Sequence, residues 1–373
     1  MAVDPSNPLR AYGANDGGFI VTSDGGTTWS TPAPLPVTSP PLGGVLVFLL
    51  SIDPNNSANI YVSEGTNSGF SPGPRLFKST DSGSSFALLQ TFPANITALA
   101  TTPLNSSVVW VGLGNGSAQR SSDGGTTWTA AAATGAPGNA IEGIAIDSTD
   151  VNTVVVVYSG FTTLPPTSRT KHVFRTIDNG TTWTEISGTD GGSPDTNLPD
   201  LLLHSVVIDG SITPHRIVVA ADSGVTQSSD NGATWQILGV SLPTVDCLSL
   251  ALDGNATPPL LRVGTYGGSA FELTQSAGPT IAVISNLAFG VVAFSTPATL
   301  PVRVFNVGSA LLTISGFSRS SGSADFQVVT PRLSPLRSPR EQSWICWCNF
   351  SRQMPAIRPR SFSSRVTIRL EGR

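Results

Sequence analysis

The stretch Ser121-Ser-Asp123-Gly-Gly125-Thr-Thr127-Trp128 is one of five copies of a short signature along the chain. Each copy has a hydroxyl residue, a spacer, Asp, a spacer, Gly, a spacer, a small residue and an aromatic residue. The other copies span residues 22–29, 79–86, 176–183 and 228–235, and the aspartates are 57, 42, 55 and 52 residues apart. This long period, with strand-forming flanks, indicates one supersecondary unit copied around a ring or along an array.

The chemistry of the signature predicts a tight turn that leads into a strand. Asp at a turn entry is expected to accept hydrogen bonds from backbone N–H groups one or two residues on, and Gly supplies a positive φ. The aromatic ring then packs between neighbouring sheets. We therefore expect a structural role for these residues: Asp24, Gly26, Trp29, Asp81, Gly83, Phe86, Asp123, Gly125, Trp128, Asp178, Gly180, Trp183, Asp230, Gly232 and Trp235.

A second recurring element is an apolar run that ends in Asp or another polar residue, followed by a turn and another apolar run. Each copy is interpreted as the first two strands of a unit. There are six such starts against five signatures, because the last unit lacks the signature. The six starts end at Asp4, Asp53, Thr102, Asp147, Asp209 and Asp253.

The signature resembles the Asp-box, also called the bacterial neuraminidase repeat. That repeat occurs in sialidases, xyloglucanase-type glycoside hydrolases, sortilin-type receptors and photosystem II assembly factors. The resemblance implies an all-β protein with a β-propeller, in which the box lies between the third and fourth strands of a blade. We expect about six blades over residues 1–277, with seven blades and a missing N-terminal part as the alternative.

Residues 278–330 resemble an immunoglobulin-like module of the abnormal-spindle/hydin (choice-of-anchor) kind. The resemblance rests on Phe289-Gly-x-Val, on the segment around Asn306 and Gly308, and on Asp325-Phe326. It implies a small and incomplete β-sandwich, since such a domain has about 100 residues.

Residues 331–373 differ from everything before them. They hold 9 Arg and 2 Glu, and they include two of the three cysteines. The apolar alternation is lost where the preceding module should supply its last strands. Our hypothesis is a frameshift in the coding sequence between roughly residues 331 and 362, and the alternative is a disordered basic tail.

Charge and composition favour a protein outside the bacterial cytoplasm, either extracellular or in the cell envelope. Residues 1–330 hold 11 Lys and Arg against 22 Asp and Glu, a balance that disfavours nucleic acid as a partner. No apolar run approaches the ~20 residues of a membrane helix. The chain starts inside a repeat with no visible signal peptide, so we expect a truncated N-terminus and a monomer.

Three acidic residues precede the signatures, where propeller loops can face the central channel: Asp16, Glu64 and Asp222. In xyloglucanase-type enzymes, which this chain resembles in the box and in Asp16-Gly-Gly, an Asp in a similar Asp-x-Gly-Gly stretch takes part in catalysis. Inverting hydrolysis needs two carboxyl groups about 6.5–9.5 Å apart. Asp16 with Asp222 is therefore the candidate pair, although Asp-Gly is also common as a simple turn.

Other site chemistry is disfavoured. His172, His204 and His215 lack metal-ligand spacing, so we expect no metal, and no nucleotide or cofactor fingerprint is present. Cys247 lies in an apolar run that predicts a buried strand. The Phe-Arg-Ile-Pro motif of sialidases is absent.

The sequence therefore favours a non-catalytic recognition or scaffold propeller of an exported bacterial protein, binding glycan or protein on its face. The alternative is a polysaccharide-cleaving glycoside hydrolase, xyloglucanase-like rather than sialidase-like. The scarcity of Trp and Tyr outside the signatures favours the first function.

Overall fold

The structure is a computed structural model with two compact units, Met1–Leu273 and Thr274–Arg373, and each is described by itself. In the first unit it describes residues 1–15, 18–31, 49–64, 73–131, 133, 135–160, 171–188, 197–238, 242, 245–254, 256 and 259–273. In the second it describes 281–283, 298–306, 318–319, 326–329, 343–350 and 368–369. Across these ranges the secondary structure is strand and turn, with no helix long and apolar enough to span a membrane.

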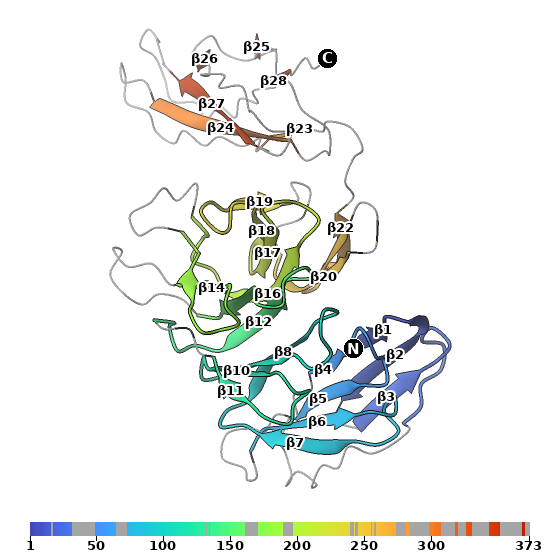
Figure 1. Ribbon diagram of the computed structural model, residues 1–373. Helices are drawn as coiled ribbons and strands as arrows, with labels where there is room; N and C mark the ends of the chain where they lie inside the picture. The colour runs from blue at the N-terminus through green and yellow to red at the C-terminus, as the bar shows by residue number, and fades with distance from the viewer. Residues whose placement is uncertain are drawn as a thin grey trace. The chain divides into compact units, whose positions relative to one another are not determined.

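The first unit consists of six antiparallel sheets that follow one another along the chain (Figure 1). Sheets 1 and 6 have three strands each, and sheets 2 to 5 have four. In order, the strands are β1 (Ala2–Asp4), β2 (Asn7–Asn15), β3 (Gly18–Thr22); β4 (Leu50–Ile52), β5 (Ile60–Glu64), β6 (Arg75–Ser79), β7 (Ala87–Thr91); β8 (Ile96–Thr101), β9 (Val109–Leu113), β10 (Ala118–Ser121), β11 (Thr129–Ala130); β12 (Ile141–Ile146), β13 (Val154–Tyr158), β14 (Val173–Thr176), β15 (Thr184–Glu185); β16 (Leu203–Asp209), β17 (Arg216–Ala221), β18 (Gly224–Ser228), β19 (Gln236–Leu238); and β20 (Cys247–Asp253), β21 (Leu260–Thr265), β22 (Ser269–Leu273).

The first strand of each sheet is its innermost strand. Strand β1 contacts β4, β4 contacts β8, and the same succession continues through β12 and β16 to β20. Each sheet therefore packs face to face on the next, which is the arrangement of propeller blades. The unit is a six-blade β-propeller, as the six starts in the sequence predicted.

Apolar side chains of the second strands fill the spaces between blades. Val154–Tyr158 is buried along its whole length, because one side of the strand faces the preceding blade and the other faces the next. Tyr61 packs with residues of the third blade, and Trp110 packs with residues of the fourth. Cys247 is fully buried in β20, as the sequence predicted.

The five signature segments form the same turn after the third strand of their blades. In the third blade, Asp123 accepts hydrogen bonds from the backbone N–H and the hydroxyl of Thr127, at 2.8 and 2.6 Å. The Ser121 hydroxyl donates to Asp123 and accepts from the Gly125 N–H. The expected acceptance from an amide one or two residues on was wrong: the turn folds back, so the donor lies four residues on.

These turns predict acid sensitivity. Hydrogen bonds, led by those from the hydroxyl groups of Thr28, Ser85, Thr127 and Thr182, lower the pKa of Asp24, Asp81, Asp123 and Asp178 from 3.8 to about 2. Because the folded-state pKa is depressed, the stabilisation is present above the unfolded value and is lost as the pH falls towards 2. The urea concentration at the midpoint of unfolding should therefore decrease as the pH is lowered from 4 to 2. The decrease should be smaller in the double variant Asp123→Asn/Asp178→Asn. An equal fall in both proteins would contradict this prediction.

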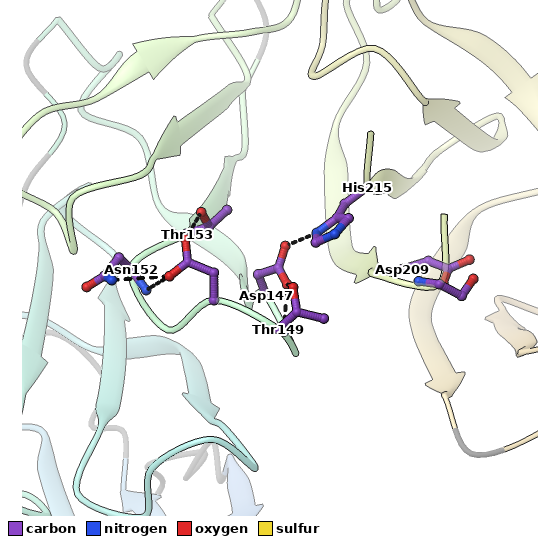
Figure 2. Close-up of polar contacts among 8 residues, drawn as sticks. Asp147, Thr149, Asn152, Thr153, Asp209 and His215 are labelled. Carbon is purple, nitrogen blue, oxygen red and sulfur yellow. Dashed lines mark hydrogen bonds and ion pairs between the residues drawn. The ribbon is translucent and has the colours of Figure 1, made fainter. Parts of the chain in front are cut away.

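Turns after the first strand also link neighbouring blades. Asp147 accepts hydrogen bonds from the N–H and the hydroxyl of Thr149, both at 2.8 Å, and its other oxygen is paired with Nδ1 of His215 in the next blade (Figure 2). The Ser106 hydroxyl donates to Asp53 of the preceding blade in a similar way, at 3.1 Å. Asp53 and Asp147 thus each close their own turn and bond a residue of the next blade.

In the second unit, four strands form one sheet in the order β23 (Ile281–Val283), β24 (Ala298–Asn306), β27 (Ser343–Phe350) and β26 (Phe326–Val329). Strands β25 (Ser318–Arg319) and β28 (Ile368–Arg369) pair separately. Strand β27 falls inside the range 331–362, so part of the Arg-rich segment pairs with β24. The immunoglobulin-like module and the frameshift stay predictions.

Candidate functional site

A bulge recurs at the start of four consecutive innermost strands. In each strand one residue is left out of the pairing register with the second strand. The four bulged residues are Thr97, Glu142, His204 and Leu248. We use the name rim for these four residues and for the first residue after the second strand of each of the same blades. The latter four residues are Gly114, Ser159, Asp222 and Tyr266.

Backbone hydrogen bonds show that the rim positions are equivalent from blade to blade. The N–H of Asp222 donates to the carbonyl oxygen of Leu202, two residues before His204, at 3.2 Å. The corresponding bonds of Gly114, Ser159 and Tyr266 measure 2.8 to 2.9 Å. Bulges redirect a side chain and are common at the rims of closed sheets and next to active sites. The rim is therefore the candidate functional site.

His204 and Asp222 form the best-defined polar contact of the rim. Nε2 of His204 lies 2.6 Å from Oδ1 of Asp222, and both side chains are partly exposed. When Nε2 carries the proton and donates to this carboxylate, Nδ1 is a hydrogen-bond acceptor. The pair holds the imidazole in one orientation at the rim.

Glu142 occupies the position of His204 in the preceding blade. A Cβ on Gly143 would lie 3.2 Å from the backbone nitrogen of Val206, so the two innermost strands approach closely beside these residues. The side chain is partly exposed, and no hydrogen-bond or ion-pair partner is found for its carboxylate among the described residues. Glu142 thus presents a carboxylate acceptor, and His204 presents Nδ1 of its imidazole, from neighbouring strands.

Glu64 does not lie at the rim, although its place in the sequence suggested a channel-facing loop. It is the last residue of β5, a strand that is buried along its whole length. Its carboxylate is 4% exposed and accepts a hydrogen bond from Nε of Arg75 at 2.6 Å. This geometry makes Glu64 one half of a buried ion pair.

Asp16, the other half of the candidate carboxyl pair, lies outside the described residues. Asp16 lies six residues before Thr22, and Asp222 likewise lies six residues before Ser228. Thr22 and Ser228 are the first hydroxyl residues of their signatures. Of the candidate pair, the structure describes Asp222, which lies at the rim.

Each of the three histidines contacts a different aspartate, and sequence analysis missed these pairs. Nε2 of His172 lies 2.8 Å from Asp200, and His204 and His215 have the partners given above. The partners are distant in the sequence, so spacing carried no signal. Among the residues with a described position, no three His, Cys, Asp or Glu side chains form a group suited to a metal ion.

Comparison with known proteins agrees with the propeller. No protein-family model matches the chain. A xyloglucanase from a Paenibacillus species is 25% identical over 278 residues, which cover 63% of this chain and 26% of the relative. The chain thus spans about a quarter of the length of this curated relative.

Solved structures are similar at lower identity. An ancestral GH74 enzyme is 18% identical, with 82% of this chain and 36% of that chain covered and a TM-score of 0.50, which shows a shared fold. YCF48 bound to D1 peptide is 17% identical, with 71% and 74% covered and a TM-score of 0.46.

Proposed function

We propose that this protein is a non-catalytic recognition propeller that binds a glycan at the rim. The observation that carries the proposal is the acceptor-rich rim of the fourth and fifth blades, built by Glu142 and the His204–Asp222 pair. Carboxylate and imidazole acceptors suit the hydroxyl groups of a sugar, and hydrogen bonds to charged groups are the stronger ones.

The placement of Glu64 supports binding rather than hydrolysis. A general acid or base must reach the proton that it transfers, directly or through one water molecule. The buried contact with Arg75 keeps Glu64 from a ligand at the rim. Export to the cell envelope or the exterior, predicted from composition, belongs to the same proposal.

A second candidate function is hydrolysis of a polysaccharide. Similarity to a xyloglucanase from a Paenibacillus species favours it. Asp222, with Asp16 from the first blade, would then supply the two carboxyl groups of an inverting mechanism. The two functions differ in one measurable respect, which is release of reducing sugar.

The test is a panel of β-glucans, xyloglucan and sialosides, with binding and reducing-sugar release measured on the same samples. We expect binding of at least one glycan without turnover. Glu142→Gln and Asp222→Asn should each weaken binding by about tenfold, since each loses a charged acceptor worth ~1.4 kcal/mol or more.

Glu272→Gln is the matched control and should leave binding unchanged, because Glu272 on β22 forms an exposed ion pair with Arg262 on β21. Reducing sugar that appears with the unmodified protein and disappears in Asp16→Asn/Asp222→Asn would establish the hydrolase instead. Binding of a protein but of no glycan in the panel would contradict both candidates.

A further inference from the structure

The tyrosines of the chain divide into three that are buried and one that is exposed. Tyr12, Tyr61 and Tyr158 are each 0% exposed and belong to the apolar clusters of the propeller. Tyr266, a rim residue of the sixth blade, is 73% exposed. Tyrosine is enriched among the residues that dominate binding, because its ring offers a large apolar surface with a polar end. Its exposure at the candidate site makes Tyr266 a contact for a ligand.

Local contacts hold the backbone of Tyr266 in place. The residue begins the turn of the hairpin between β21 and β22, in which Thr265 pairs with Ser269. The N–H of Tyr266 donates to the carbonyl oxygen of Asp246 at 2.8 Å, and the hydroxyl of Thr265 donates to the carbonyl oxygen of Ser269 at 2.7 Å. A short hairpin that is bonded at its base loses little conformational entropy when a ligand binds.

Leu248, the bulged residue of the same blade, adds a second apolar side chain to the rim and is 45% exposed. Further along β20, the N–H of Leu250 donates to the hydroxyl oxygen of Ser205 at 3.1 Å, so the starts of β16 and β20 lie side by side. Ser205 follows His204 directly. The apolar part of the rim on the sixth blade therefore adjoins the His204–Asp222 pair on the fifth.

The chemistry of the rim thus changes from blade to blade. The fourth and fifth blades present the acceptors of Glu142 and of the His204–Asp222 pair, and the sixth presents Tyr266 and Leu248. Ligand sites commonly combine aromatic and apolar side chains with a few polar groups that fix orientation. A pyranose ring matches this combination, because hydroxyl groups surround its edge and C–H groups cover its face.

We propose that Tyr266 forms an aromatic subsite, on which one pyranose ring of an oligosaccharide stacks while other sugar units bond to the acceptors of the fourth and fifth blades. The inference rests on the proposed glycan binding and adds the class of ligand. The innermost strand of the fifth blade, β16, lies between β12, which carries Glu142, and β20 of the sixth blade. Sheets packed face to face lie about 10 Å apart. Two such intervals exceed the width of one sugar ring, so a monosaccharide cannot occupy both parts of the rim.

The test is calorimetric titration of the full chain with cello-, manno- and chito-oligosaccharides, from the monosaccharide to the tetrasaccharide. In at least one series we expect the tetrasaccharide to bind about tenfold more tightly than the monosaccharide, because it makes two linked sets of contacts. Tyr266→Ser should weaken binding of that tetrasaccharide by about 30-fold, as loss of an aromatic hot spot does. Tyr266→Phe keeps the ring and should bind within about threefold of the unmodified protein.

Ile177→Ser is the matched control and should leave binding unchanged. Ile177 is 62% exposed, and it lies in the signature turn after β14, at the opposite end of its blade from the rim. A tetrasaccharide that binds equally well to Tyr266→Ser and to the unmodified protein would overturn the proposal. So would a monosaccharide that binds as tightly as its tetrasaccharide.

These outcomes separate the subsite from the proposed function. Binding that is weakened in Asp222→Asn but not in Tyr266→Ser would remove the aromatic subsite and leave glycan recognition at the rim intact. If no member of the three series binds, the subsite proposal fails. The proposed function fails only if the polysaccharide panel also shows no binding.

Discussion

Arg75→Met should destabilise the propeller by about 3–5 kcal/mol, because it leaves the buried Glu64 carboxylate without its partner. Nε of Arg75 donates to Glu64 at 2.6 Å, and the guanidinium also lies over the ring of Phe77. A buried carboxylate that loses its ion pair keeps the full cost of its desolvation. The free energy of unfolding in urea, followed by circular dichroism, measures the effect.

Two variants make this prediction specific. Arg262→Met removes a largely exposed ion pair with Glu272, and should change the free energy of unfolding by at most about 0.5 kcal/mol. Arg75→Met/Glu64→Leu replaces both charges with apolar groups and should recover most of the loss. An Arg75→Met protein as stable as the Arg262→Met control would show that Glu64 reaches water, and would restore Glu64 as a candidate catalytic residue.

The sequence predicted the architecture because the information lies in short local patterns. The signature specifies a turn by residue type, and the first-strand starts specify where each blade begins. Positive φ at Gly26, Gly83, Gly125, Gly180 and Gly232 follows from the same local chemistry. A repeat also supplies several copies of each pattern, so one atypical copy, such as Thr102 among the six starts, does not obscure the architecture.

The rim was not predictable in the same way. A bulge such as that at Glu142 depends on how two strands pair, and the pattern of apolar residues within one strand does not show that pairing. His204 and Asp222 meet because β16 and β17 pair with that bulge in place. Sequence position suggests a channel-facing loop for Glu64, and it does not reveal that this residue ends a buried strand with its carboxylate bonded to Arg75.

Gly180→Ala should be comparably damaging, at about 3 kcal/mol, for two reasons that add. The residue has φ of 85°, where an L side chain costs ~1–2 kcal/mol. Its new methyl group would lie 2.7 Å from the ring of Trp110 and 2.8 Å from Cβ of Ala131, and overpacking of this kind costs ~1–3 kcal/mol. Urea unfolding of the full chain measures the sum.

Gly26→Ala separates the two contributions. Gly26 has φ of 93°, so it carries the same backbone cost, but no atom of another described blade lies within 4 Å of the added methyl group. We expect it to lose only ~1–2 kcal/mol. Equal losses at Gly26 and Gly180 would mean that backbone strain alone sets the cost, and that the glycine contacts between blades contribute little to stability. A larger loss at Gly180 would show that the signature glycine is required twice, once for the turn and once for the close approach of the blades.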